Sequence, residues 1–373
     1  MGKRNTVISI CKAIGIILMV ITHSECPSAL CTFAYEFHMP LFFITAGYFF
    51  SVKYLSDEAT FVKKRIKGLY LPFVKWAVFF LIIHNWMFDL GILNEKYGNP
   101  GGGVTHPYSW HQMQQNLWTI VTAMGGYDQF LNGAFWFFRG LFVASIFYLV
   151  LFKLFDMAAT GAGKQAWRTT VVPVTVCLAA LALGAWKTGE GLRVTNLIQG
   201  GYREIMGTFF FGCGFIFRQM HEKYKATWWS TIAFAAITLV FSLYAPSSMA
   251  WNADFERFLR LPLPAICGFL MTYNISLWLD RREGRLKRFL VFCGDNTLQI
   301  LVFHLVAFKV VSIVKIWWYG LDFLQIGCHT VIHVHSQDDL FWILYTIAGV
   351  GIPLSFGKPS RTQGRTSGEP PLA

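Results

Sequence analysis

The chain has 373 residues, of which 54% are hydrophobic and only 14% charged, and its formal net charge is +12. A soluble globular domain carries roughly a quarter charged residues, so this composition excludes an ordinary soluble enzyme. The basic residues occur in short clusters between apolar segments rather than on one continuous face. This pattern indicates membrane topology and excludes nucleic acid as a partner. The sequence therefore predicts an all-α, polytopic integral membrane protein.

Apolar segments of suitable length predict about ten transmembrane helices. We expect them at residues 7–27, 37–53, 69–87, 134–152, 171–186, 203–217, 228–245, 262–279, 290–313 and 340–355. Basic residues are roughly three times as frequent in the loops on one side, so both termini are predicted to be cytoplasmic. Residues 1–355 then form one membrane-embedded domain with a long outer loop, 88–133. The polar tail 356–373 is expected to be disordered.

The first predicted span carries two ionisable residues, Lys12 and His23, eleven positions apart. In an α-helix this spacing is close to three whole turns, so both side chains lie on one face and are separated by about 16 Å along the axis. Ionisable residues inside a membrane segment are costly and indicate function. Lys12 and His23 could therefore contact the two ends of one long substrate.

A second polar group is expected at the same membrane face as His23. His38 opens the second span in the run HMPLFF, and Glu36 precedes it by two positions. Histidine is the natural general base near neutral pH, so His23 and His38 are the candidate catalytic residues. Arg139, in FWFFRGLF, could pair with an anionic substrate group or with Glu36. A hydrogen-bonded interfacial histidine is the structural alternative for either His.

The ninth predicted span has a polar side, NTLQILVFH, that begins at Asn296 and reaches His304 near mid-depth. Both residues are candidates for substrate binding, and a structural histidine between helices is the alternative for His304. His329, His333 and His335 lie in a predicted outer loop without a helix to set their spacing. A solvated loop is therefore favoured there, and no metal site is predicted.

A basic block follows the second span on the side expected to be cytoplasmic. It reads VKKRIKGLYLPF, and it places Lys64, Arg65 and Lys67 where they could hold the phosphates of an anionic cytosolic donor. Contact with lipid phosphates is the equally open alternative. The outer loop 88–133 is rich in Gly, Trp, Tyr and Gln, which suits a sugar or lipid head group but also an interfacial aromatic belt.

These motifs together resemble the membrane-bound acyltransferase family 3. The resemblance rests on Lys12 and His23 with ten positions between them, on FHMPLFFITAGYFF at 37–50, on the basic block ending in Leu-Pro, on FWFFRGLF and on NTLQILVFH. The family has Arg at the position of Lys12, and lysine keeps the charge but not bidentate phosphate recognition. Its Arg-x-x-Arg motif is also incomplete here, because Gly68 follows Arg65 by three positions.

The resemblance implies a multi-pass enzyme of the cell membrane, the inner membrane if the source is bacterial. Its expected donor is acyl-coenzyme A, most simply acetyl-coenzyme A, with no permanently bound cofactor. The implied acceptor is a hydroxyl of a surface or exported glycan or of a lipid-linked sugar. Membrane lipids and other proteins of cell-envelope biosynthesis are the remaining expected partners. The alternative is a transporter or flippase that moves an acylated polysaccharide or lipid intermediate through the same polar channel.

Overall fold

The computed structural model describes residues 5–98, 106–125, 133–158, 164–192, 201–251, 254–336 and 338–357. Within these ranges every regular element is helical and there is no strand, so the all-α prediction is confirmed. Residues 358–373, nearly all of the predicted tail, lie outside the described residues. The helices that frame the two halves of the site are α1 (Thr6–Thr22), α3 (His38–Tyr48), α8 (Trp136–Met157), α10 (Tyr202–Met220) and α15 (Thr297–Tyr319).

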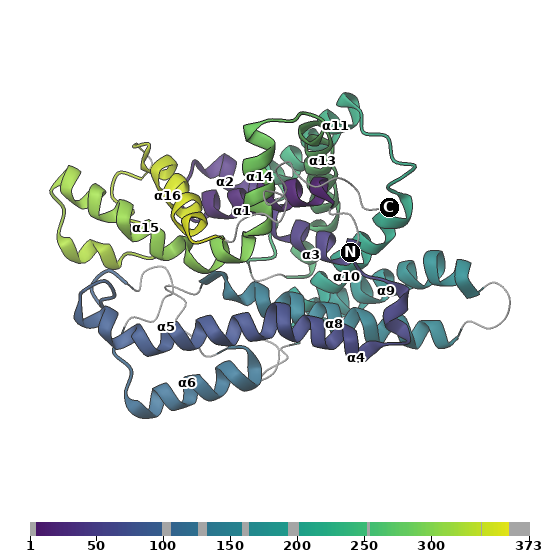
Figure 1. Ribbon diagram of the computed structural model, residues 1–373, viewed down its shortest axis with the longest axis horizontal. Helices are drawn as coiled ribbons and strands as arrows, with labels where there is room; N and C mark the ends of the chain where they lie inside the picture. Colours follow the sequence, from purple (N-terminus) through teal and green to yellow (C-terminus); the bar gives the residue numbers. More distant parts are fainter. Residues whose placement is uncertain are drawn as a thin grey trace, which may run out of the picture.

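The remaining elements complete the bundle (Figure 1). The α-helices are α2 (Ser28–Tyr35), α4 (Glu58–Arg65), α5 (Leu71–Asp89), α6 (Trp110–Ala123), α9 (Lys164–Gly189), α11 (Trp228–Tyr244), α12 (Phe255–Arg260), α13 (Pro262–Asp280), α14 (Arg285–Asp295) and α16 (Phe341–Ser355). The short helical turns are η1 (Val52–Leu55), η2 (Ile66–Tyr70), η3 (Gly133–Phe135) and η4 (Phe323–Gly327).

Several helix ends follow from capping residues in the sequence. The Asn5 side chain accepts a hydrogen bond from the Ile8 amide at 3.1 Å and so starts α1. Asp57 accepts from the Thr60 amide at 3.2 Å and starts α4. Thr227 and Ser230 form a reciprocal capping box at the start of α11. Each cap satisfies an amide at the helix end that has no partner within the helix.

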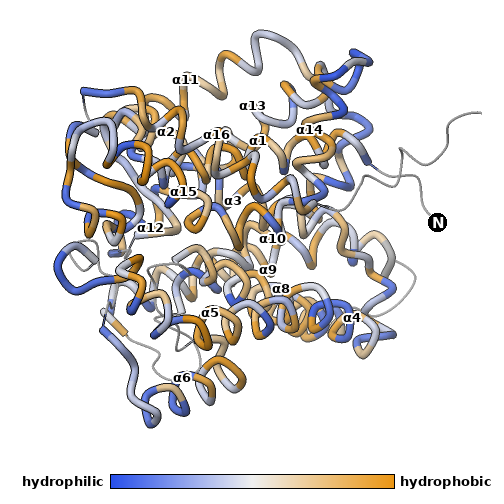
Figure 2. Tube along the Cα trace, turned by 60° about the vertical axis from the view of Figure 1, so that its left-hand side comes forward, coloured by the Kyte–Doolittle hydropathy of each residue, from blue (hydrophilic) through white to orange (hydrophobic). Residues whose placement is uncertain are grey.

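Six helical segments of the described chain are long and apolar enough to cross a membrane, which makes this a multi-pass membrane protein. They are Ser28–Tyr48, Glu58–Asp89, Gly133–Met157, Ala166–Gly189, Phe255–Asp280 and Thr297–Tyr319. Three shorter apolar helices, α1, α11 and α16, accompany them. Figure 2 shows apolar colouring along most helices and polar colouring at many of the turns and ends. The expected number of ten spans and the cytoplasmic placement of both termini stay predictions.

The structure corrects three details of the expected elements. The loop 88–133 contains a helix, α6, which begins at a capping box formed by Ser109 and Gln112 and packs beside α5. The helix around the third expected span begins at Glu58 and continues through the π-helical turn η2 into α5. The expected span 290–313 is broken at Asn296, which separates α14 from α15.

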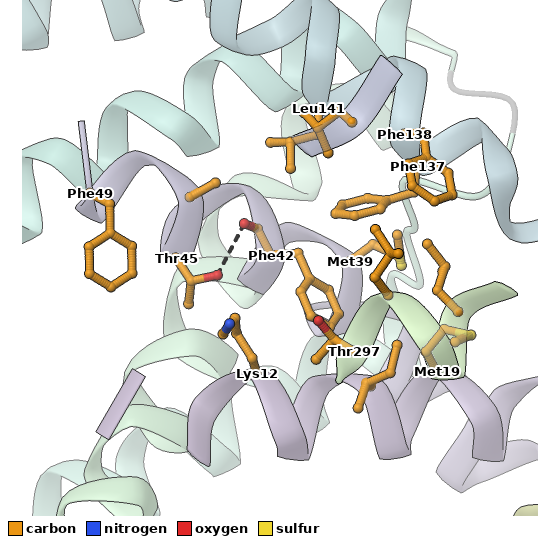
Figure 3. Close-up of a pocket in the computed structure, with 15 residues that line it drawn as sticks. Lys12, Met19, Met39, Phe42, Thr45, Phe49, Phe137, Phe138, Leu141 and Thr297 are labelled. Carbon is orange, nitrogen blue, oxygen red and sulfur yellow. Dashed lines mark hydrogen bonds between the residues drawn. The ribbon is translucent and has the colours of Figure 1, made fainter. Parts of the chain in front are cut away.

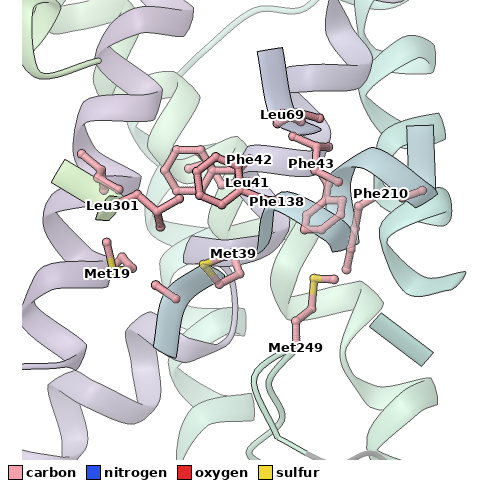
Figure 4. Close-up of a cluster of buried hydrophobic side chains, with 14 of the residues drawn as sticks. Met19, Met39, Leu41, Phe42, Phe43, Leu69, Phe138, Phe210, Met249 and Leu301 are labelled. Atoms are coloured by element: carbon pink, nitrogen blue, oxygen red, sulfur yellow. The ribbon is translucent and has the colours of Figure 1, made fainter. Parts of the chain in front are cut away.

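The backbones of α3 and α10 pack in direct contact in the core. A Cβ atom on Gly214 would overlap the backbone of Ile44, and one on Gly47 would overlap the backbone of Phe211. Glycine at these two positions lets the helix backbones touch, which is a common device in membrane helix packing. Around this contact, Met39, Phe43, Phe138 and Phe210 form part of one continuous buried cluster (Figure 4).

Candidate active site

An apolar cavity of about 240 Å³ lies between α1, α3, α8 and α15. Lys12, Thr45 and Thr297 are polar residues of its wall, and Figure 3 shows Lys12 reaching from α1 toward Thr45 on α3. The rest of the wall is almost entirely apolar: Ile16, Met19, Met39, Phe42, Ala46, Phe49, Leu69, Phe137, Phe138, Leu141, Leu298 and Leu301. Such a space accepts a largely apolar chain, and Lys12 offers a positive charge beside it.

A second cavity, of about 320 Å³, is lined mainly by polar side chains. Its wall consists of Thr22, His23, Tyr35, Gly133, Trp136, Arg203, Ala250, Leu305, His329 and Thr330. These residues come from α1, α2, η3, α8, α10 and α15 and from three connecting segments, so chain regions far apart in sequence meet there. We call the first space the apolar cavity and this one the polar cavity.

The two cavities are stacked along shared helices. On α1 the apolar cavity reaches Met19 and the polar cavity begins at Thr22. On α15 the corresponding residues are Leu301 and Leu305, and on α8 Phe137 adjoins Trp136. Three or four residues of helix correspond to about one turn, or roughly 5 Å. A substrate in the apolar cavity therefore ends close to the side chains of the polar cavity.

His23, directly after the last residue of α1, is oriented by a second histidine. His23 Nδ1 lies 2.9 Å from His304 Nε2, and His304 Nδ1 lies 3.1 Å and 3.0 Å from the carbonyl oxygens of Ile300 and Leu301. A carbonyl only accepts, so Nδ1 of His304 carries the proton and its Nε2 accepts in the neutral ring. His23 Nδ1 then donates to His304, and His23 Nε2 is left with a free lone pair.

A connecting segment fixes His23 from the other side. The hydroxyl of Thr330 donates to the backbone carbonyl of His23 at 2.7 Å. Three residues further along, the imidazole of His333 pairs with the carboxylate of Glu25. His335 lies against the ring of Tyr319, with centroids 4.7 Å apart. The segment expected to be a solvated loop thus packs against the end of α1, and two of its residues, His329 and Thr330, line the polar cavity.

His38, the other catalytic candidate, is 1% exposed and lies one layer away from the cavity. Its Nδ1 donates to the carbonyl of Ala34 at 2.7 Å, and its ring lies 5.3 Å from that of Tyr35, which lines the polar cavity. This geometry suits a residue that holds Tyr35 in place. The assignment of His38 as a second catalytic residue stays a prediction.

Glu36 and Arg139 have separate buried partners. Arg139 Nε lies 3.2 Å from Glu204 Oε1, and both side chains are at most 4% exposed. Glu36 accepts from the backbone amide and from the hydroxyl of Ser247, each at 2.9 Å. Sequence reasoning left open an ion pair between Arg139 and Glu36. The structure instead pairs Arg139 with Glu204, and this buried ion pair connects α8 to α10.

Asn296 and the basic block have more local positions. Asn296 links α14 to α15, with its amide donating to the carbonyl of Phe292 at 3.0 Å, while the next two residues line the apolar cavity. Lys64 donates to the hydroxyl of Tyr54 at 2.9 Å, and the guanidinium of Arg65 lies over the ring of Phe61. Lys67 is exposed and belongs to η2, the same turn as Leu69, which lines the apolar cavity.

Sequence reasoning missed Tyr35, Trp136, Arg203, His329 and Thr330 as residues of the polar cavity. Trp136 belongs to the quoted motif FWFFRGLF and Tyr35 lies two positions before FHMP, so these motifs were the available signal. Arg203 and Thr330 reach the cavity only through tertiary packing. Among the described residues no group of three or more His, Cys, Asp or Glu side chains is placed to hold a metal ion.

The geometry agrees with the comparison to known protein families. A family model described as an acyltransferase domain matches residues 5–357. Neither a curated protein nor a solved structure matches the chain. The match spans almost the whole sequence, including both cavities, and it decides for the enzyme over the transporter. The chain thus belongs to acyltransferase family 3 and is a membrane acyltransferase.

Proposed function

We propose that this acyltransferase moves an acetyl or similar short acyl group from coenzyme A to a hydroxyl of a surface or exported glycan or of a lipid-linked sugar. The observation that carries the proposal is His23 of the polar cavity, paired with His304 and one helical turn from the apolar cavity that Lys12 lines. The coenzyme A thioester approaches through the apolar cavity, and the acceptor hydroxyl enters the polar one.

His23 acts as the general base in this reaction. Its Nε2 takes the proton of the acceptor hydroxyl while the hydroxyl oxygen attacks the thioester carbonyl carbon. The resulting imidazolium is stabilised because His23 Nδ1 donates to His304 Nε2. When the tetrahedral intermediate collapses, the carbon–sulfur bond breaks and the thiolate of coenzyme A takes the proton from His23. The products are an ester and free coenzyme A, and both histidines return to their starting state.

The donor is held at the opposite end of α1. In this proposal Lys12 binds a donor phosphate, and the rise of about 16 Å from Lys12 to His23 along the helix axis leaves room for an extended thiol arm between the two. Lys67 is exposed in η2, the turn whose Leu69 lines the apolar cavity, and is a further donor-binding candidate. Lys64 and Arg65 stay donor-binding candidates, each already in contact with an aromatic ring.

The acceptor is recognised in the polar cavity. The hydroxyl, imidazole and guanidinium groups there suit a molecule rich in hydroxyl groups, and the rings of Tyr35 and Trp136 offer faces against which a sugar can stack. We place the protein in the cell membrane, where a lipid-linked or exported sugar meets a cytosolic donor. Asn296 and Glu36 are supporting residues here, because they lie next to the residues that line the cavities.

The direct test follows acetyl groups from labelled acetyl-coenzyme A in membranes that contain the protein. His23→Ala is expected to lower transfer at least 100-fold, as for loss of a general base, while binding of the donor is retained. The matched control is His111→Ala, because His111 is an exposed histidine of α6 bonded to Gln115 at 2.8 Å. Equal transfer by wild type and His23→Ala would refute the proposed role of His23.

A further inference from the structure

Arg203 is a cation in the polar cavity whose partners among the described residues are all neutral. It is half-buried in the first turn of α10 and lines the cavity together with His23. Its Nε donates to the carbonyl of Met249 at 3.0 Å and its Nη2 to the carbonyl of Ala250 at 2.6 Å. The guanidinium also lies over the ring of Trp136, 4.6 Å from the centroid.

No described carboxylate compensates this charge. The neighbouring Glu204 is engaged by Arg139, and the contacts of Arg203 are the two carbonyls and the side chains of Trp136 and Tyr202. A cation in the first turn of a helix is also disfavoured by the helix dipole. A half-buried arginine at such a position, with no carboxylate partner in the part of the chain that the structure describes, indicates that the missing negative charge comes from a ligand.

The geometry fixes the guanidinium for this purpose. The carbonyls of Met249 and Ala250 occupy two of its five N–H groups, and the stacking on Trp136 holds its plane. The N–H groups that remain can donate to an oxyanion, and arginine binds carboxylate and phosphate in a bidentate manner. Trp136 lines the same cavity, so it adjoins both the arginine and any ligand in the cavity.

We infer that the acyl acceptor carries a negatively charged oxyanion, a carboxylate or a phosphate, which Arg203 binds while His23 activates a hydroxyl of the same molecule. The inference rests on the proposed function. At about 320 Å³ the polar cavity lies at the lower end of the roughly 300–1,000 Å³ typical of small-molecule sites, which suits one sugar unit with one charged group. Arg203 is thus the specificity-determining residue of the acceptor site.

The first experiment measures binding without turnover, with purified protein and three probes: methyl glucoside, methyl glucuronide and glucose 6-phosphate. Wild type is expected to bind one of the charged probes at least tenfold more tightly than the neutral one, and which of the two binds distinguishes a carboxylate from a phosphate. Arg203→Gln is expected to abolish this preference, and Arg203→Lys to keep only part of it, because lysine lacks the bidentate fork. Arg257→Gln, an exposed arginine of α12, is the control.

The absence of any preference for a charged probe in wild type, or an unchanged preference in Arg203→Gln, would overturn the inference. Arg203 could instead stabilise the reacting carbonyl of the thioester. Hydrolysis of acetyl-coenzyme A in the absence of acceptor distinguishes this role from acceptor binding. Hydrolysis unaffected by Arg203→Gln supports acceptor recognition, whereas a parallel loss of hydrolysis and transfer contradicts it. If His23→Ala leaves transfer intact while Arg203 still governs probe binding, the proposed catalysis fails and the anion site stands.

Discussion

The two cavities share α1, α8 and α15, yet their walls have opposite chemistry. The apolar cavity has mostly aliphatic and aromatic side chains with Lys12 at its edge, and the polar cavity gathers two histidines, an arginine and two threonines. The difference arises within one helical turn, between Met19 and His23. The end of α1 can therefore serve both an apolar arm and a hydroxyl. The other polar groups, Tyr35, Arg203, His329 and Thr330, come from elements that do not line the apolar cavity.

The largest effect on acyl transfer in these comparisons is expected from replacement of His304, the partner of His23. Replacing His304 by Ala removes the acceptor for His23 Nδ1, so the imidazolium formed during transfer loses its stabilisation. We expect transfer to fall by roughly 10- to 100-fold, as for loss of an orienting hydrogen bond, with little change in donor affinity.

The pH profile of transfer distinguishes this role from simple packing. His304→Gln still fills most of the space and can accept a hydrogen bond, so it is expected to restore part of the rate and to shift the pH dependence. If His304→Ala lowers the rate but leaves the pH dependence of transfer identical to wild type, His304 has only a packing role.

The close contact of α3 with α10 is the next most sensitive feature, because α3 contributes Met39, Phe42 and Thr45 to the apolar cavity. Gly214→Ala forces the two backbones apart and is expected to lower the free energy of unfolding by about 1–3 kcal/mol. Thermal unfolding in detergent measures the change. Gly351→Ala is the control, since its added Cβ meets no atom within 4 Å and alanine favours the helix. Equal destabilisation by both substitutions would contradict the packing argument.

The apolar cavity can be filled without touching the polar one. Leu141 is 6% exposed on α8 and lines the apolar cavity, so Leu141→Trp is expected to weaken acetyl-coenzyme A binding by about tenfold, equivalent to about 1.4 kcal/mol. Leu154→Trp, at a 58% exposed position of the same helix, serves as the control. Isothermal titration with the donor measures both. Unchanged donor affinity in Leu141→Trp would show that the donor does not occupy this cavity.

The smallest effect concerns the pair that fastens the segment after α15 to the end of α1. The hydrogen bond that His333 donates to the carboxylate of Glu25 raises the pKa of His333. For Glu25, burial alone would raise the pKa, but hydrogen bonds from His333 and Ser336 outweigh it and lower the pKa. The His333 contribution to stability is complete below its unfolded pKa of about 6.5, and that of Glu25 above its unfolded pKa of about 4.3.

His333→Ala is therefore expected to lower the thermal midpoint most between about pH 4.3 and 6.5. The loss should fade as pH rises through the raised pKa of His333 or falls through the lowered pKa of Glu25. Because the His333 side chain is 48% exposed, the loss in free energy of unfolding should stay below about 1 kcal/mol. A destabilisation that is as large at pH 9 as at pH 5.5 would rule out this ion pair as its cause.

Sequence reasoning predicted the helical class and the helix that carries Lys12, because apolar runs and the 3.6-residue period are local properties. It placed His23 inside that helix, whereas α1 ends at Thr22 and His23 is the next residue. It also named His304 as a candidate site residue, because a polar stripe on an apolar helix can be recognised from the sequence. It could not identify Arg203 or Thr330 as cavity residues, since their approach to His23 depends on how α10 and the segment after α15 pack. Likewise Glu204, the partner of Arg139, lies 65 residues away in the chain, so only the fold reveals the pair.

The most direct test of the account compares Lys12→Gln with His23→Ala over a range of acetyl-coenzyme A concentrations. We predict that Lys12→Gln raises the donor KM by about tenfold, as for loss of one charged contact, and largely recovers at saturating donor. His23→Ala should lower kcat with donor affinity retained. If both variants lose kcat and donor affinity in the same proportion, the division between a donor-binding apolar cavity and a catalytic polar cavity is wrong.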